Sequence, residues 1–322
     1  MKEVGIVKNN VFICYTPLQI LLSEKIIELE NIDTFILIFY FEKDNAKSKY
    51  YFNKLSSKAK QAFYIKKNNQ IFSALKSFCF LYLKLRKFSS PYNFFTGNIK
   101  SAYSRFIIYL LGFKVLYTFD DGIGNVCGDG YFYGNIKPSA IISLLPFLRL
   151  NFTYGKMHSQ IKKHYSIYTL PNVMPNSTYV NLFNYDFLEV LNQVEKEIVI
   201  LLTSTLHEEG YMKLEQEKAL YNNITTKYNV THVISHPLEK FKKIDNPQIV
   251  LIESEKIAEE IILNLRKEYT KIKVIGISSS ALFNLKGMEG VEIINIHYNE
   301  NAPDANMENI LSLFNIETYY LS

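Results

Sequence analysis

Two groups of polar residues follow short apolar runs in the second half of the chain. The first run, 197–202, leads into a loop with hydroxyl groups and two adjacent carboxylates, Glu208 and Glu209. The second run, 230–235, leads into His236 and Pro237. A carboxylate can accept a proton from an attacking hydroxyl, and a histidine can donate to a leaving phosphate. These residues predict a group-transfer site, although two ordinary surface loops would explain the same residues equally well.

Hydroxyl-bearing residues accompany both groups and could bind an anionic ligand. Thr203 and Ser204 open the loop that precedes the two acids. Ser278, Ser279 and Ser280 follow another apolar run and precede a helix-like segment. Hydroxyls and backbone N–H groups at a helix N-terminus suit a phosphate, and ordinary helix capping is the alternative interpretation.

A third acidic motif, Asp120-Asp121-Gly122, follows an apolar run in the first half of the chain. Adjacent residues on an extended backbone point in opposite directions, so the two carboxylates rarely bind one metal ion together. We therefore expect no metal site, and instead one Asp that contacts a sugar hydroxyl or bonds to Asn125 in the following turn. The chain contains no P-loop, Gly-x-Gly-x-x-Gly, His-Glu-x-x-His or Gly-x-Ser-x-Gly motif.

The elements that must position these residues alternate between strand and helix. This alternation predicts an α/β fold with parallel sheets, in which ligands bind at the carboxyl ends of strands. The pattern restarts after a turn-rich segment, which predicts two Rossmann-like domains, 1–190 and 191–322, that face a cleft. We expect strands at 11–14, 34–41, 114–119, 198–202, 232–234, 249–251, 273–277 and 291–294, and short strands directly after 50–63, within 91–97 and within 154–169. We expect helices at 18–29, 50–63, 71–88, 99–111, 212–227, 257–268, 280–285 and 307–314.

The composition limits the class of protein. The 322 residues are 48% hydrophobic and 21% charged, so the chain can bury a sizeable core. A formal net charge of +5 is too small to predict nucleic-acid binding. Three widely spaced cysteines, a polar N-terminus and the lack of an apolar run of roughly 20 residues predict a cytoplasmic protein. A basic, aromatic helix at 71–88 and an apolar stretch at 139–150 leave peripheral contact with the inner membrane open.

Several motifs, in this order, resemble the bacterial lipooligosaccharide sialyltransferases of glycosyltransferase family 52. They are Cys14-Tyr15-Thr16-Pro17-Leu18-Gln19, Tyr50-Tyr51-Phe52-Asn53 with Lys58-Ala59, Phe119-Asp120-Asp121-Gly122-Ile123-Gly124-Asn125, the acidic loop, His236-Pro237 and Ser279-Ser280-Ala281-Leu282. The resemblance runs from about residue 12 to about residue 290.

This resemblance implies a GT-B glycosyltransferase, with an N-terminal domain on the acceptor side and a C-terminal domain that binds CMP-sialic acid. The acceptor would be a galactose-terminated glycan, the linkage α-2,3 with α-2,6 left open, and no metal or other cofactor would be required. A carboxylate of the second-half loop would act as the base. His236 and the paired serines would hold the phosphate, and one direct displacement would invert the anomeric carbon.

Some points stay open after the resemblance. The family has a single Asp where this chain has Glu208 and Glu209, and we prefer Glu209 because the adjacent Gly210 would allow close approach of a ligand. Asp120 and Asp121 remain competing bases or acceptor contacts. A non-catalytic nucleotide- or glycan-binding protein and a peripheral membrane protein are the alternatives. The oligomeric state, a homodimer included, is also open.

Overall fold

The computed structural model describes residues 9–67, 71–87, 91–126, 154–183, 196–277, 279–298 and 305–321. The chain forms two compact units, Met1–Leu182 and Phe183–Ser322. The predicted domain boundary after residue 190, the apolar stretch 139–150 and Ser278 lie outside the described residues.

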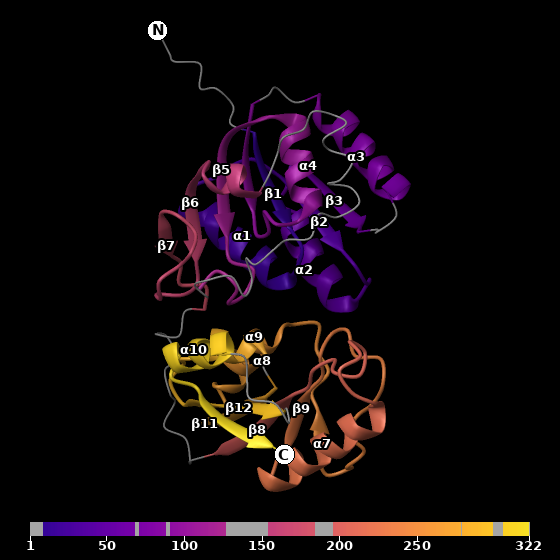
Figure 1. Cartoon of the computed structure of the whole chain (residues 1–322), viewed down its shortest axis with the longest axis vertical. Coiled ribbons are helices and arrows are strands. Elements are labelled where there is room, and N and C mark those ends of the chain that lie inside the picture. The colour runs from indigo at the N-terminus through magenta and orange to yellow at the C-terminus, as the bar shows by residue number, and fades with distance from the viewer. Residues whose placement is uncertain are drawn as a thin grey trace. The chain divides into compact units, whose positions relative to one another are not determined.

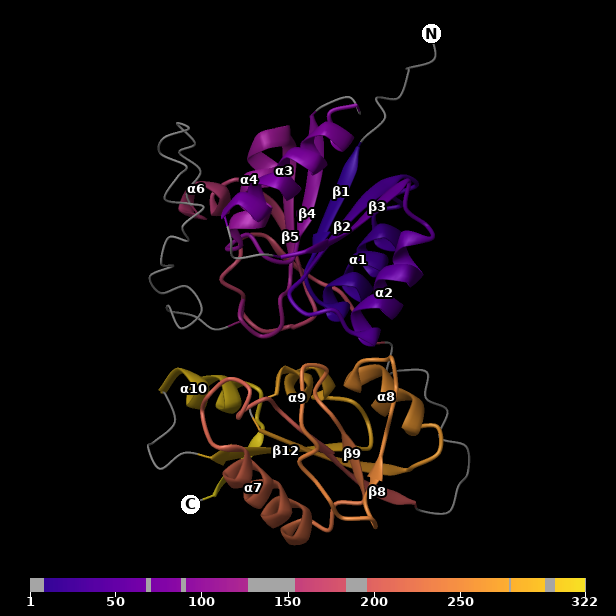
Figure 2. The same ribbon diagram turned by 90° about the vertical axis from the view of Figure 1, so that its right-hand side faces the viewer.

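The N-terminal unit contains a seven-stranded parallel sheet in the order β3-β2-β1-β4-β5-β6-β7 (Figure 1). Its strands are β1 (Asn10–Cys14), β2 (Phe35–Phe41), β3 (Gln61–Lys66), β4 (Tyr92–Thr96), β5 (Phe113–Phe119), β6 (Ile161–Ser166) and β7 (Ser177–Tyr179). Its helices are α1 (Pro17–Leu29), α2 (Ala46–Ser56), α3 (Ile71–Leu85), α4 (Ala102–Leu111) and α6 (Tyr154–His158). Figure 2 shows α1 and α2 on one face of this sheet and α3 and α4 on the other.

The sequence explains this layered arrangement. Strand β2 reads Phe-Ile-Leu-Ile-Phe-Tyr-Phe and is buried over six of its seven residues, as expected for a central strand that helices cover on both faces. Its Ile36, Ile38 and Tyr40 belong to the core that α3 and α4 complete. Helix α1 begins where the Thr16 hydroxyl accepts a hydrogen bond from the Gln19 backbone N–H and Pro17 takes the first helical position.

The C-terminal unit contains a six-stranded parallel sheet in the order β10-β9-β8-β11-β12-β13. Its strands are β8 (Glu197–Leu202), β9 (His232–Ile234), β10 (Val250–Leu251), β11 (Lys271–Gly276), β12 (Val291–Tyr298) and β13 (Glu317–Leu321). Its helices are α7 (Leu214–Lys227), α8 (Ala258–Leu265), α9 (Ser280–Leu285) and α10 (Ala305–Leu313). Helix α7 lies on one face of the sheet, and α8, α9 and α10 lie on the other (Figure 2).

One predicted helix is misplaced and three elements were missed. The helix expected at 50–63 begins earlier, because the Asn45 side chain caps it by accepting the Ser48 N–H at 2.8 Å. It ends at Ser56, and the short strand expected after it is β3, which begins at Gln61 and pairs with β2. The missed elements are α6, β7 and β13. Each has five residues or fewer, and none contains more than one Val, Ile or Leu, whereas the equally short β9 contains Val233 and Ile234.

Both sheets have the strand order of a dinucleotide-binding fold. In this order, successive strands are added first on one side of the starting strand and then on its other side, so the direction of strand addition reverses once. The reversal lies between β1 and β4 in the first sheet and between β8 and β11 in the second. Ligands bind beside the carboxyl ends of strands at such a point. The loops after β1, β4 and β5, and after β8, β9 and β11, are therefore where a site is expected. Within the described residues, no helix has the length and apolar character needed to cross a bilayer.

Candidate active site

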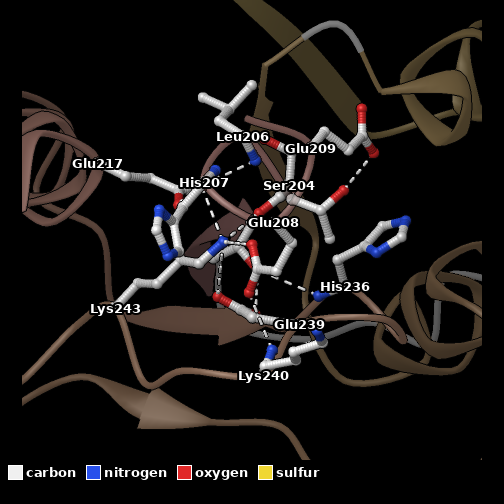
Figure 3. A network of polar contacts seen from close by, with 12 residues as sticks. Ser204, Leu206, His207, Glu208, Glu209, Glu217, His236, Glu239, Lys240 and Lys243 are labelled. Carbon is white, nitrogen blue, oxygen red and sulfur yellow. Dashed lines mark hydrogen bonds and ion pairs between the residues drawn. The ribbon is translucent and has the colours of Figure 1, made fainter. Parts of the chain in front are cut away.

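A buried lysine joins the loops that follow β8 and β9 (Figure 3). The side chain of Lys243 is 1% exposed, and its Nζ donates to the Ser204 carbonyl at 2.7 Å. The same nitrogen lies 2.9 Å from Glu208 and 2.8 Å from Glu217. Glu239 is 3.6 Å away. Burial lowers the pKa of Lys243, but its bonds to the glutamates outweigh this effect and raise the pKa. The ammonium group is therefore held in its charged form.

The loop after β8 forms a single helical turn, and Glu217 stabilises this turn. The carboxylate of Glu217 accepts the backbone N–H groups of Leu206 and His207. The turn ends with Gly210 at φ +83°, where Gly210 N–H donates to the His207 carbonyl and Tyr211 N–H to that of Leu206. This pattern is a Schellman motif, which favours glycine because of its left-handed backbone. A Cβ at Gly210 would meet no atom within 4 Å, so the backbone angle, rather than close packing, explains the glycine.

The adjacent acids of this loop have different surroundings. Glu208 points into the network, where it accepts the Lys240 backbone N–H at 2.9 Å. Burial raises the pKa of Glu208, but hydrogen bonds from Lys240 and Lys243 outweigh it and lower the pKa to about 2. Glu209 is exposed, points away from Lys243 and accepts the Thr205 hydroxyl at 2.5 Å (Figure 3). Glu208 is thus a weak base that anchors the loop, whereas Glu209 is accessible to a ligand.

The position of His236 is fixed by hydrogen bonds at the end of β9. Its backbone N–H donates to Thr203 Oγ1 at 3.1 Å, and the Thr203 hydroxyl donates to Glu239 at 2.8 Å. The ring nitrogen Nδ1 accepts the Leu238 backbone N–H at 3.3 Å. A neutral imidazole that accepts at Nδ1 carries its proton on Nε2. Nε2 is then a hydrogen-bond donor, which is what a departing phosphate requires.

The serines after β11 lie at the same edge of the sheet. Ser279 is the N-cap of α9 and makes no side-chain capping bond, and Ser280 is exposed. Strand β11 is paired with β8, and β8 with β9, all in parallel. The carboxyl ends of three neighbouring strands therefore place Thr203, Ser204, His236, Pro237, Ser279 and Ser280 at one edge of the sheet, where the Thr203 hydroxyl bonds to Glu239 and the Ser204 hydroxyl to Tyr221.

In the N-terminal unit, the two aspartates after β5 point in opposite directions, as predicted from the extended backbone. Asp120 is fully buried. One carboxylate oxygen accepts His164 Nε2 at 2.9 Å and Asn125 Nδ2 at 3.2 Å. The other accepts the Ser166 hydroxyl at 2.7 Å and the Ile167 N–H at 2.8 Å. Four hydrogen-bond donors thus contact the Asp120 carboxylate, which connects the end of β5 to the end of β6.

Asp121 is accessible to solvent and is held by two side-chain amides. Gln19 Nε2 donates to one carboxylate oxygen at 2.5 Å, and Asn98 Nδ2 donates to the other at 2.9 Å. Although the residue keeps solvent access, burial by the surrounding protein raises the pKa of Asp121 to about 6, against the lowering effect of the two amides. A carboxylate with this pKa can accept a proton efficiently near neutral pH.

Gln19 and Asn98 were not identified from the sequence. Gln19 is fully buried, and its Oε1 accepts the Tyr15 backbone N–H at 2.7 Å. A Cβ at Gly97 would lie 2.4 Å from the Gln19 carboxamide carbon, so glycine is needed there for the amide to reach Asp121. Both amides follow the strands that flank the reversal point, β1 and β4. That position is a usable signal, because a residue after either strand lies at the expected ligand edge.

Among the described residues, no group of three or more His, Cys, Asp or Glu side chains is arranged to hold a metal ion. Metal independence stays a prediction.

The family model of glycosyltransferase family 52 matches residues 33–300. The chain belongs to this family. A CMP-N-acetylneuraminate:beta-galactoside alpha-2,3-sialyltransferase of Pasteurella multocida is 26% identical over 299 residues, which cover 91% of this chain and 93% of that protein. An N-acetyllactosaminide alpha-2,3-sialyltransferase of Haemophilus influenzae is 26% identical over 290 residues, 88% of this chain and 90% of that protein.

A solved structure supports the fold class of this family 52 chain. A Listeria monocytogenes protein described as a UDP-N-acetylglucosamine 2-epimerase has a TM-score of 0.52 at 13% identity, and the match covers 90% of this chain and 79% of that one. The similarity shows the fold alone. Together with the two parallel sheets of the same strand order, it confirms the predicted GT-B class.

The Lys243 network leads to a stability prediction for the family 52 chain. Lys243→Met should lower the free energy of unfolding by about 3–5 kcal/mol, because it leaves buried carboxylates without their cation. Lys242→Met is the matched control, since that side chain is 74% exposed and pairs only with Asp245 among the described residues. Its effect should be within about 0.5 kcal/mol. Urea unfolding measures both, and equal losses would contradict the anchoring role of Lys243.

Proposed function

We propose that this chain is an inverting sialyltransferase that transfers sialic acid from CMP-sialic acid to the terminal galactose of a glycan, in α-2,3 linkage. The names of the Pasteurella and Haemophilus relatives support the donor, the acceptor sugar and the linkage. The observation that carries the proposal is the hydrogen bond from Leu238 N–H to His236 Nδ1, since a neutral imidazole that accepts at Nδ1 has Nε2 as its donor. The acceptor would be of the lipooligosaccharide or capsule type.

The donor side of the reaction requires stabilisation of an anionic leaving group. The bond between the anomeric carbon and the phosphate oxygen breaks, and CMP departs with the electron pair. His236 Nε2–H and the hydroxyls of Ser279 and Ser280 would donate hydrogen bonds to the phosphate as its charge grows. Donors that are fixed before the reaction stabilise such a charge without reorganising. The proposal includes no metal ion.

The acceptor side requires a base for the galactose hydroxyl, whose oxygen forms the new bond to the anomeric carbon. Asp121 is our first choice, because burial raises its pKa to about 6 and two amides fix its carboxylate. Glu209 is the second, because it is accessible and follows the strand next to that of His236. Glu208 is the weakest of the three, since its pKa of about 2 makes it a poor proton acceptor.

The activity can be tested directly. Incubation with CMP-sialic acid and a panel of β-galactosides should give an α-2,3-linked product and free CMP, and EDTA treatment should leave the rate unchanged. Mass spectrometry and linkage analysis identify the product. Binding of CMP with no transfer to any galactoside would instead support a non-catalytic nucleotide-binding protein.

The donor contacts can be tested by titration calorimetry with CMP. His236→Ala and Ser279→Ala should each weaken CMP binding by about tenfold or more, the loss expected for a hydrogen bond to a charged group. His232→Ala is the matched control, because His232 belongs to β9 itself, whereas His236 follows the strand. Unchanged affinity in both site variants would reject the phosphate site, and an equal loss in the control would show a general effect on the unit.

The base can be identified from variants and the pH profile. A base must be unprotonated, so kcat/KM of the unmodified enzyme should rise as the pH increases through about 6. Asp121→Asn should lower kcat by about a hundredfold or more and remove this rise. Glu209→Gln should keep most of the turnover.

If Glu209→Gln instead loses turnover while Asp121→Asn keeps a near-normal kcat, the base belongs to the C-terminal unit. An increase in the acceptor KM alone in Asp121→Asn would make Asp121 an acceptor contact. Circular dichroism and the melting temperature of both variants are the controls for folding.

A further inference from the structure

Helix α3 is apolar on the face that packs into the core and also on the face that meets solvent. The buried face, at most 1% exposed, consists of Ala74, Phe78, Leu81 and Leu85. On the outer face, Phe72 is 88% exposed, Leu83 is 50% exposed and Phe80 is 46% exposed. An ordinary surface helix has polar residues opposite its core face. The outer face of α3 therefore needs another explanation.

Five of the exposed residues form one stripe along the helix. Phe72, Lys76, Cys79, Phe80 and Leu83 follow one another at spacings of three, four or one residue. At about 100° per residue, these positions fall within roughly one third of the helix circumference, opposite the buried face. Phe80 also contacts Phe63 edge to face, with ring centroids 5.9 Å apart, and the Lys84 ammonium lies 5.8 Å above the Phe80 ring. Apolar and basic groups are thus mixed on a single surface.

The segment of the chain that contains α3 is strongly basic. Residues 45–119 contain 14 Lys and Arg and no Asp or Glu. Because the formal net charge of the whole chain is +5, all other residues together carry −9. Four of the basic residues lie on or directly after α3, and all four are exposed: Lys76, Lys84, Arg86 and Lys87. None of these four forms an ion pair with an acidic residue in the described part of the chain.

We propose that the outer face of α3, defined by Phe72, Lys76, Phe80, Leu83 and Lys84, docks on an anionic lipid bilayer. Aromatic and aliphatic side chains would enter the region between headgroups and acyl chains, and the basic groups would contact anionic headgroups. The helix lies at the outside of its unit beside α4 (Figure 1). The inference does not depend on the proposed function.

The mixture of groups favours a bilayer over other occupants. A nucleic acid would satisfy the basic side chains but offers no apolar phase for Phe72 and Leu83. The core of a protein interface is depleted in lysine, whereas Lys76 lies in the middle of this stripe. A bilayer of anionic lipids provides both a negative surface and an apolar layer beneath it.

Vesicle flotation with the full chain tests the inference. The protein should float with vesicles of phosphatidylcholine and phosphatidylglycerol, but not with phosphatidylcholine alone, and salt should weaken the binding. Lys76→Gln with Lys84→Gln should lower the partition coefficient by about tenfold or more, as expected for two charges near an anionic surface. Phe72→Ser with Leu83→Ser should lower the partition coefficient by at least about tenfold. The reason is that the favourable free energy of moving these two apolar side chains from water into the bilayer is lost.

The matched control is Leu313→Ser with Lys271→Gln in the C-terminal unit. Leu313 is 54% exposed, close to the 50% of Leu83, and this pair should leave vesicle binding unchanged. Circular dichroism and the melting temperature show whether each variant is folded.

Three results would overturn the inference. They are equal binding to vesicles with and without the anionic lipid, an equal loss in the control pair, and no binding to vesicles of either composition. In the last case, a dimer that Phe72→Ser and Leu83→Ser dissociate would assign the surface to a second copy of the chain. Binding to a DNA or RNA oligomer in place of vesicles would likewise reject the bilayer as the occupant.

Discussion

The ion-pair network around Lys243 is the constraint on which the C-terminal ligand edge depends. An ammonium group and several carboxylates are removed from water there, and this is unfavourable unless every group is paired. Lys243 satisfies the condition by bonding to Glu208, Glu217 and the Ser204 carbonyl at once. Because these residues come from the loops after β8 and β9 and from α7, one cation fixes the ends of two neighbouring strands. The positions of Thr203 and His236 follow from this arrangement.

The same division of roles occurs in both units. Each ligand edge contains two adjacent acids, Asp120-Asp121 after β5 and Glu208-Glu209 after β8. In each pair, the first acid is engaged in a buried network and the second is accessible to solvent. The first acid holds the loop in place, so the second can remain exposed without the loop losing its conformation. A doubled acid in a sequence can therefore mean one structural and one available carboxylate, rather than a metal site.

The sequence predicted the parts of the molecule that hydrophobic patterns determine. Strand β9 and helix α9 were placed with the bounds that the structure has, because apolar runs and polar breaks mark them. Lys243 was missed because the run Lys240-Phe241-Lys242-Lys243 has the composition of a solvated surface segment. Its burial depends on acids 26 and 35 residues away, which no local pattern reveals. Gln19 was missed for a similar reason, since its partner Asp121 is 102 residues distant.

The difference between Asp121 and Glu209 as a proton acceptor comes from how each carboxylate is held. Gln19 and Asn98 each donate to a different oxygen of Asp121, and Gly97 leaves the space that keeps Gln19 in place. Such a carboxylate loses little side-chain entropy when an acceptor binds. Glu209 is exposed on a turn, and the hydroxyl of Thr205 donates a hydrogen bond to it. It would have to be ordered by the substrate, at a cost that reduces its effectiveness. Preorganisation and proton affinity therefore both favour the carboxylate of the N-terminal unit.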